Sequence, residues 1–188
     1  MKLSKKVMVV GAVTALVGLV VPAAHAADPT DVTVTGGSLS ITSPTVANFS
    51  AVTLNGTAQT TTAAMDAFSV SDLRGTGAGW NTTVQATPFA QHNGTIYVAS
   101  GKTLAQNSLS MPAPTVAANG TTSAVPTITA GPYSIDGAAA VKFASAATNA
   151  GMGIYDFTQG GLLTLSIPST AYATTYRSDV TVSVVTGP

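Results

Sequence analysis

The sequence predicts an all-β fold, a two-sheet antiparallel β-sandwich of about ten strands with a signal peptide in front. Three observations predict it. Thr, which favours strands, occurs 29 times after position 26, whereas Glu is absent and Lys is rare, so the usual residues of surface helices are missing. Apolar and polar residues alternate along several short stretches. Gly-containing turn dipeptides separate those stretches.

The first residues have the order of features found in a signal peptide. Three lysines precede an uncharged apolar run from Val7 to Val21, and the small-residue pattern Ala24-His25-Ala26 follows it. The run is shorter than the roughly 20 residues of a transmembrane helix, although an uncleaved anchor is the alternative. We expect residues 1–26 to be a signal peptide cleaved after Ala26, and residues 27–188 to be one β-sandwich domain without a membrane span.

Period-two alternation indicates the strands. Phe68 and Val70 share one face, and the apolar residues of 163–167 and of 180–184 do the same, with Thr, Ser or Asp on the opposite face. Each pattern is typical of a strand with one buried face. We expect strands near 32–42, 49–54, 66–73, 80–86, 95–99, 103–111, 124–129, 138–144, 152–157, 162–167 and 174–185.

Turn signals lie between these strands. A glycine-rich segment, Gly75 to Gly79, is expected to form a hairpin turn rather than a nucleotide loop, because neither a Lys nor a helical pattern follows it. The stretch 112–131 contains three prolines and is expected to be a long loop or edge region. Four dipeptides are typical of hairpins: Asn55-Gly56, Asn93-Gly94, Asn119-Gly120 and Asp136-Gly137.

Charge and catalytic residue types are scarce after residue 26. Four cations stand against seven Asp, so we expect no nucleic-acid partner, which would require a basic patch. The absence of Cys excludes disulfides and Cys-based zinc sites. His92 is the only His of this part and is expected to be a solvated turn residue. We therefore expect no enzyme, no cofactor and no metal site, although a carboxylate pair assembled from distant Asp residues stays open.

Two stretches carry the most information. In the first, Asp72 and Arg74 lead through Gly75-Thr76-Gly77-Ala78-Gly79 into Trp80, the only Trp of the chain. The second runs from Tyr176 to Pro188 and contains Arg177 and Asp179.

Together these stretches resemble the WxL domain of Gram-positive cell-surface proteins. That family has a Trp-x-Leu motif after a Gly-rich turn, and a distal motif of the form Tyr-x-x-x-Leu-Thr-Trp-x-Leu-x-x-x-Pro. Here Thr82 stands in place of the Leu, and Val182 in place of the distal Trp. Tyr176, Thr181 and Pro188 match the distal motif, and the resemblance covers essentially all of residues 27–188.

The resemblance implies a secreted domain at the cell wall or cell surface, held non-covalently, with peptidoglycan as the ligand. It also implies a possible second partner, a membrane-anchored companion surface protein. The alternative is a structural subunit of a surface fibre or layer that assembles by strand addition, with Val32-Thr33-Val34 or Val180-Thr181-Val182 as the exchanged strand.

The candidate wall-binding or partner-binding residues are Trp80, Asp72, Arg74, Tyr176, Arg177 and Asp179. Each has a structural alternative. A single Trp at the start of a strand is more often a core residue than an exposed platform for a sugar ring. Tyr176 is expected to tie a strand corner through its hydroxyl. The two Asp and two Arg form either separate surface pairs or one network that unites both stretches.

Overall fold

A computed structural model describes residues 28–187 of the chain. The predicted signal peptide and its cleavage site at Ala26 lie outside the described residues. By its internal contacts the chain divides after Thr33 into two units. Residues 28–33 of the first unit contain no regular secondary structure, and the description below concerns the second unit, from Val34 onward.

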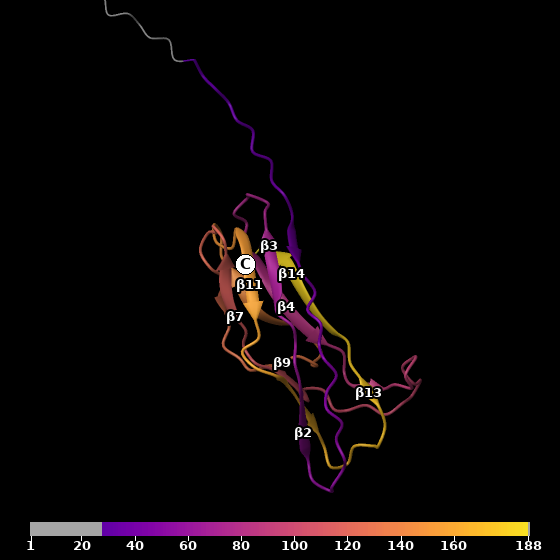
Figure 1. Cartoon of the computed structure of the whole chain (residues 1–188). Coiled ribbons are helices and arrows are strands. Elements are labelled where there is room, and N and C mark those ends of the chain that lie inside the picture. The colour runs from indigo at the N-terminus through magenta and orange to yellow at the C-terminus, as the bar shows by residue number, and fades with distance from the viewer. Residues whose placement is uncertain (1–27, 188) are drawn as a thin grey trace, which may run out of the picture. The chain divides into compact units, whose positions relative to one another are not determined.

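The described part contains fourteen strands and no helix, and every pair of neighbouring strands is antiparallel (Figure 1). One sheet has the order β1 (Leu39–Ile41), β3 (Phe68–Asp72), β11 (Gly153–Thr158), β7 (Thr115–Asn119). A second has the order β14 (Val180–Thr186), β4 (Trp80–Ala86), β10 (Val141–Ala146), β8 (Thr127–Ile128). A third has the order β2 (Gln59–Ala63), β12 (Leu163–Ile167), β6 (Leu109–Met111), β9 (Tyr133–Ser134). A two-stranded ribbon pairs β13 (Tyr176–Arg177) with β5 (Ala90–Gln91).

These sheets form two layers, each interrupted once. Along the chain, β2 is followed directly by β3, β11 by β12, and β6 by β7, so three strands of the first sheet are each joined to a strand of the third. The joined strands lie in the same order in both sheets. In the same way β14 and β4 connect directly to β13 and β5. The antiparallel, sandwich-like all-β class is therefore confirmed, with fourteen short strands where about ten longer ones were expected.

The interruption of the first layer follows from its residues. Pro112 and Pro114 separate β6 from β7, and proline cannot donate a ladder hydrogen bond. Gly160, between β11 and β12, lies against the same segment, because a Cβ there would come within 2.4 Å of the Ala113 carbonyl oxygen. The stretch 112–131 is the predicted edge region rather than one long loop, since β7 and β8 lie within it and each is the edge strand of its sheet.

Other local predictions were wrong for identifiable reasons. Residues 49–54 and 95–99 form no strand, whereas β2 at 59–63 was not predicted because its sequence, Gln-Thr-Thr-Thr-Ala, has no apolar alternation. The glycine-rich segment joins β3 to β4, which belong to different sheets, and so is not a hairpin turn. Asn93-Gly94 does close a tight turn, in which Asn93 N donates to Ile96 O at 3.2 Å.

The core lies between the two layers and is rich in aromatic rings. Phe68 and Phe157 of the first layer stack at 4.9 Å, and the edge of Phe143 from β10 meets both. Trp80 of β4 packs against Tyr155 and Phe157 of β11. All five rings are at most 3% exposed, so the predicted inward face of β3 is confirmed.

Candidate functional site

Asp72 and Arg74 form a buried clamp at the end of β3. The Asp72 carboxylate accepts from Arg74 Nε at 2.8 Å and from Nη2 at 2.9 Å, and the two side chains are 1% and 15% exposed. The hydrogen bond from Arg74 lowers the pKa of Asp72 below its usual value, although burial opposes that effect. The interpretation of this pair as a weak, solvated surface pair is therefore wrong.

The clamp connects the glycine-rich stretch that contains Trp80 to the C-terminal stretch. Arg74 Nη1 donates to Thr186 Oγ1 at 2.8 Å, and Nη2 donates to the Gly79 carbonyl oxygen at 2.8 Å. Gly187 N also donates to Gly79 O at 3.2 Å. One guanidinium thus joins the end of β3, the glycine-rich segment and the end of β14.

Trp80 is a core residue. Its side chain is fully buried, and its Nε1 donates to the carbonyl oxygen of Gly151 at 2.9 Å. Gly151 has a φ of +73°, and a Cβ there would lie 2.6 Å from the indole nitrogen, so the ring requires a glycine at this position. A buried indole cannot serve as an exposed platform for a sugar ring. No pattern in the sequence pointed to Gly151, because it lies 71 residues away from Trp80.

Thr82 and Val182, the two departures from the family pattern, both face the core. Thr82 is fully buried and points its hydroxyl toward the Ala144 carbonyl oxygen at 3.5 Å, while Val182 is 8% exposed and lies opposite Val84. Both are therefore packing positions of β4 and β14. The Leu and Trp that are replaced would have contributed to the interior at these positions.

Arg177 and Asp179 lie far from the clamp. Thr186, which Arg74 binds, is seven residues along the chain from Asp179, so the two groups are about 23 Å apart along an extended strand. Charges separated by more than a Debye length of about 10 Å are screened from one another. The prediction of one Asp–Arg network that unites both stretches is therefore wrong.

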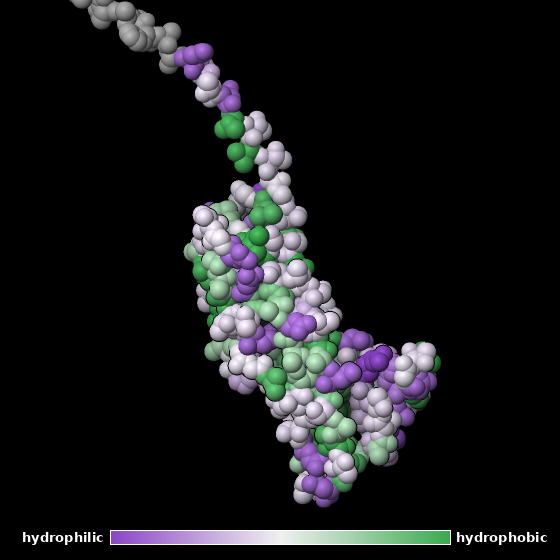
Figure 2. Space-filling view, in the orientation of Figure 1, coloured by the Kyte–Doolittle hydropathy of each residue, from purple (hydrophilic) through white to green (hydrophobic). Residues whose placement is uncertain are grey.

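Instead, Arg177 and Asp179 belong to a polar cluster around the β13–β5 ribbon. Asp179 Oδ2 accepts from the Tyr97 hydroxyl at 2.6 Å. Burial raises the pKa of Tyr97, and this hydrogen bond raises it further. Figure 2 shows hydrophilic residues gathered around β13, whereas the rest of the visible face of the domain is mostly near-white or green.

His92 belongs to the same cluster and is not a solvated turn residue, since it is only 4% exposed. Its ring meets the Tyr97 ring edge-on at 5.2 Å. Gly94 N faces Nδ1 at 3.0 Å, and Arg177 Nη1 faces Nε2 at 3.1 Å. Because a neutral imidazole offers one lone pair, only one of these two contacts is a hydrogen bond in a given tautomer.

Tyr176 ties a corner of the chain through its hydroxyl, as predicted for a structural role. Its hydroxyl donates to the Tyr172 carbonyl oxygen at 3.1 Å and accepts from Tyr172 N at 3.2 Å. Tyr172 itself is 60% exposed, and Lys102 Nζ lies 4.2 Å from its ring centroid, a cation–π distance. The exposed aromatic rings near the ribbon are thus Tyr97 and Tyr172, which the sequence had not singled out.

A groove of about 410 Å³ runs over the outer surface of β4 and β14 and ends at Asp179. Its polar lining comes from outward residues of the two strands together with Gln106. The connection before β10 contributes Gly137, Ala138 and Ala140.

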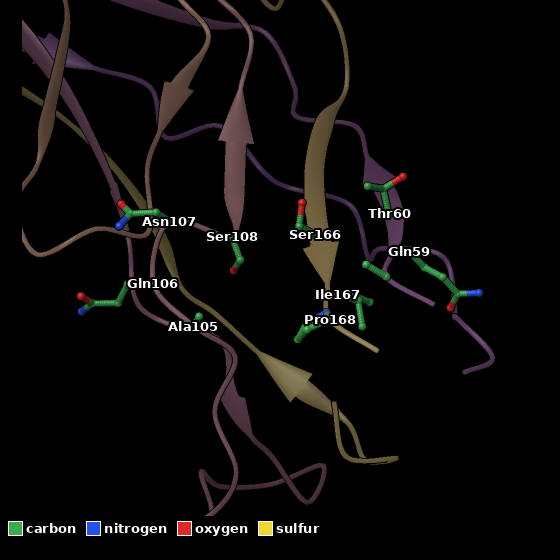
Figure 3. Close-up of a pocket in the computed structure, with 10 residues that line it drawn as sticks. Gln59, Thr60, Ala105, Gln106, Asn107, Ser108, Ser166, Ile167 and Pro168 are labelled. Carbon is green, nitrogen blue, oxygen red and sulfur yellow. The ribbon is translucent and has the colours of Figure 1, made fainter. Parts of the chain in front are cut away.

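A second cavity, of about 540 Å³, lies at the ends of β2, β12 and β6. Figure 3 shows Gln106 and Asn107 on one side of it, Thr60 on the other, and Ile167 and Pro168 between them. No charged or aromatic side chain lines this cavity.

The described residues contain no group of three or more His, Cys, Asp or Glu that could hold a metal ion. None of the elements between residues 28 and 187 is a helix that could span a bilayer.

Comparison with known proteins identifies the family. Residues 19–188 match the family described as WxL domain surface cell wall-binding. No curated protein and no solved structure matches the chain. The matched range includes the clamp, Trp80 and the whole of β14. The family is one of wall-binding domains rather than of enzymes, and it places the chain at the cell-wall surface. The chain belongs to the WxL family of surface domains that bind the cell wall.

Proposed function

We propose that this protein binds the wall non-covalently by contact with the glycan of peptidoglycan, and that the outer face of β14, β4 and β10 makes that contact. The observation that carries the proposal is the composition of this face. Its outward residues are hydroxyl or amide side chains with a single cation and one exposed valine, namely Asn81, Thr83, Gln85, Lys142, Ser145, Thr181, Ser183 and Val185.

The strand register aligns these side chains across the sheet. Gln85 lies opposite Thr181, and Thr83 lies opposite both Ser183 on one side and Lys142 on the other. Neighbouring strands are about 4.8 Å apart, so the face offers rows of hydroxyl and amide groups at regular spacing. Hydroxyls and amides both donate and accept hydrogen bonds, which matches the hydroxyl and amide groups of an uncharged glycan.

Sedimentation with purified wall tests the proposal. The exported chain, residues 27–188, is mixed with peptidoglycan before and after its secondary polymers are removed. We expect the protein to pellet equally with both. Failure to pellet with either would contradict wall binding, and loss of pelleting after removal would assign the binding to the secondary polymers instead.

A pair of matched variants tests which face is used. Thr181→Glu places a bulky charge on the proposed face, and Thr62→Glu places it at an exposed threonine on β2, in the other layer. We expect the first variant to pellet less than the wild type and the second to pellet equally. Equal pelleting of all three proteins would contradict the assignment of this face.

A membrane-anchored companion surface protein is a second proposed partner, which rests on the family resemblance alone. Cross-linking on intact cells followed by mass spectrometry of the captured proteins tests it. We do not propose the alternative of a surface-fibre subunit, because Val180–Val182 is paired with β4 in its own sheet and Val32–Val34 forms no strand, so no observation favours either as an exchanged strand.

A further inference from the structure

We propose that the groove at the Asp179 end of the outer face is a subsite for an acetamido sugar of the wall glycan. This inference rests on the proposed function, because it names the place and the chemical group by which that face recognises its ligand. The sequence pointed to one of its lining residues, Asp179, but not to the groove itself. It arises because β4, β14, Gln106 and the 137–140 connection lie around one hollow.

The groove combines an apolar strip with a polar rim. Pro88, Ala138 and Ala140 provide the apolar contacts, and Gln85, Gln106, Thr181 and Ser183 provide amides and hydroxyls. Within residues 28–187, none of these four polar side chains makes a hydrogen bond to another part of the protein. Their donors and acceptors are therefore available to a ligand.

Asp179 gives the groove an oriented carboxylate. Its Oδ2 is held by the Tyr97 hydroxyl at 2.6 Å, and its backbone N donates to Thr87 Oγ1 at 2.9 Å. It forms no ion pair with any described residue, because the neighbouring Arg177 is directed toward His92. The second carboxylate oxygen can therefore accept a hydrogen bond from a sugar hydroxyl, and hydrogen bonds to a charged group are among the strong ones.

These features favour an uncharged sugar that carries an acetamido group. The two glutamine amides can donate to the acetamido carbonyl and accept from its N–H. The apolar strip accommodates the acetamido methyl group, and the Asp179 carboxylate repels an anionic polymer. The larger cavity at β2, β12 and β6 lacks a charged or aromatic side chain to orient a ligand, so we do not assign it.

Titration of the isotope-labelled exported chain with a soluble probe tests the inference. The probe is tetra-N-acetylchitotetraose, and cellotetraose, which has the same linkage without acetamido groups, is its control. We expect amide signals of residues 85, 106 and 179 to shift with the first sugar only. Absence of binding, or equal binding of cellotetraose, would overturn the acetamido assignment.

Variants localise the binding. Gln85→Ala removes a hydrogen-bonding amide, and Asp179→Asn removes the charge of the acceptor carboxylate; each is expected to weaken binding of the probe about tenfold. Thr62→Ala, at an exposed position of β2 in the other layer and outside the groove lining, is expected to bind like the wild type. Equal affinity in all four proteins, with unchanged melting temperatures, would overturn the groove as the subsite.

The two proposals fail in different ways. If the Gln85→Ala/Asp179→Asn double variant loses the soluble probe and also pellets less with peptidoglycan, the groove is supported. If the double variant pellets like the wild type, the assignment of the groove as the sugar subsite is wrong, while wall binding by the protein stands. If the wild type does not pellet at all, wall binding is wrong, and the titration still decides whether the groove binds the sugar.

Discussion

Replacement of Arg74 by alanine tests whether the Asp72–Arg74 clamp stabilises the domain. The change removes the bidentate partner of a carboxylate that is 1% exposed, and it removes two further hydrogen bonds, to Thr186 Oγ1 and to Gly79 O. The variant should fold with the same strands, because no core side chain is altered. It should be less stable, because a buried carboxylate is left without its cation.

The size of the loss can be estimated from these contacts. Removal of one partner of a buried ion pair costs about 3–5 kcal/mol. Arg74 itself is 15% exposed, so water can reach the vacated position, and we take the lower end, about 3 kcal/mol. In a domain of this size, 1 kcal/mol corresponds to about 2–4 °C in melting temperature, so a decrease of about 6–12 °C is expected.

Trp80 provides the assay, because it is the only Trp and is fully buried. Its emission reports thermal and urea unfolding of wild type and variants. Arg177→Ala is the matched control, since Arg177 is exposed and its loss should cost less than about 1 kcal/mol. A melting temperature of Arg74→Ala within about 2 °C of the wild type would refute the reasoning.

Three further predictions concern other contacts. Gly151→Ala should lower the unfolding free energy, measured in urea, by several kcal/mol and by clearly more than Gly94→Ala. Both glycines have a positive φ, but only a Cβ at position 151 would clash with its neighbours. Tyr176→Phe should lower the unfolding free energy by about 1 kcal/mol, because its hydroxyl ties the corner four residues upstream; no change would contradict that role. The difference in melting temperature between wild type and Arg74→Ala should narrow as the pH falls below about 4. The pKa of Asp72 is lowered by Arg74, so their contact stabilises the wild type only while the carboxyl is ionised. A difference that stays constant with pH would contradict this.

The sequence predicted best where side chains alternate over a buried face. The inward positions of β3, β12 and β14 follow from Phe68 and Val70, from the apolar residues of 163–167 and from the valines of the last strand, because one buried face leaves a period of two in the sequence. The same rule failed for β2, whose inward residues are Thr61 and Ala63. A strand that buries small or hydroxyl side chains carries no alternation of hydrophobicity to detect.

The site was less predictable because it depends on contacts between distant residues. Arg74 and Thr186 are 112 positions apart, and Tyr97 and Asp179 are 82 apart. Sequence spacing does not show which residues of such distant strands lie side by side. The single Asp–Arg network was therefore predicted from residue types alone, without knowledge of their positions in the fold. The predicted corner role of Tyr176 is local, with a partner four residues away, and it was correct.

The position of the clamp has a consequence for rearranging the chain. Gly37 N donates to Leu73 O at 2.7 Å, and Gly187 N donates to Gly79 O, so both ends of the folded unit meet the segment that carries Arg74. Chain ends that lie close together allow a protein to be circularly permuted. A short Gly/Ser linker from position 187 to position 37, with new ends opened at the exposed Gly94 turn, should preserve the fold. The same geometry marks residue 187 as an attachment point for a reporter, seven positions beyond the start of β14 and away from the Asp179 groove.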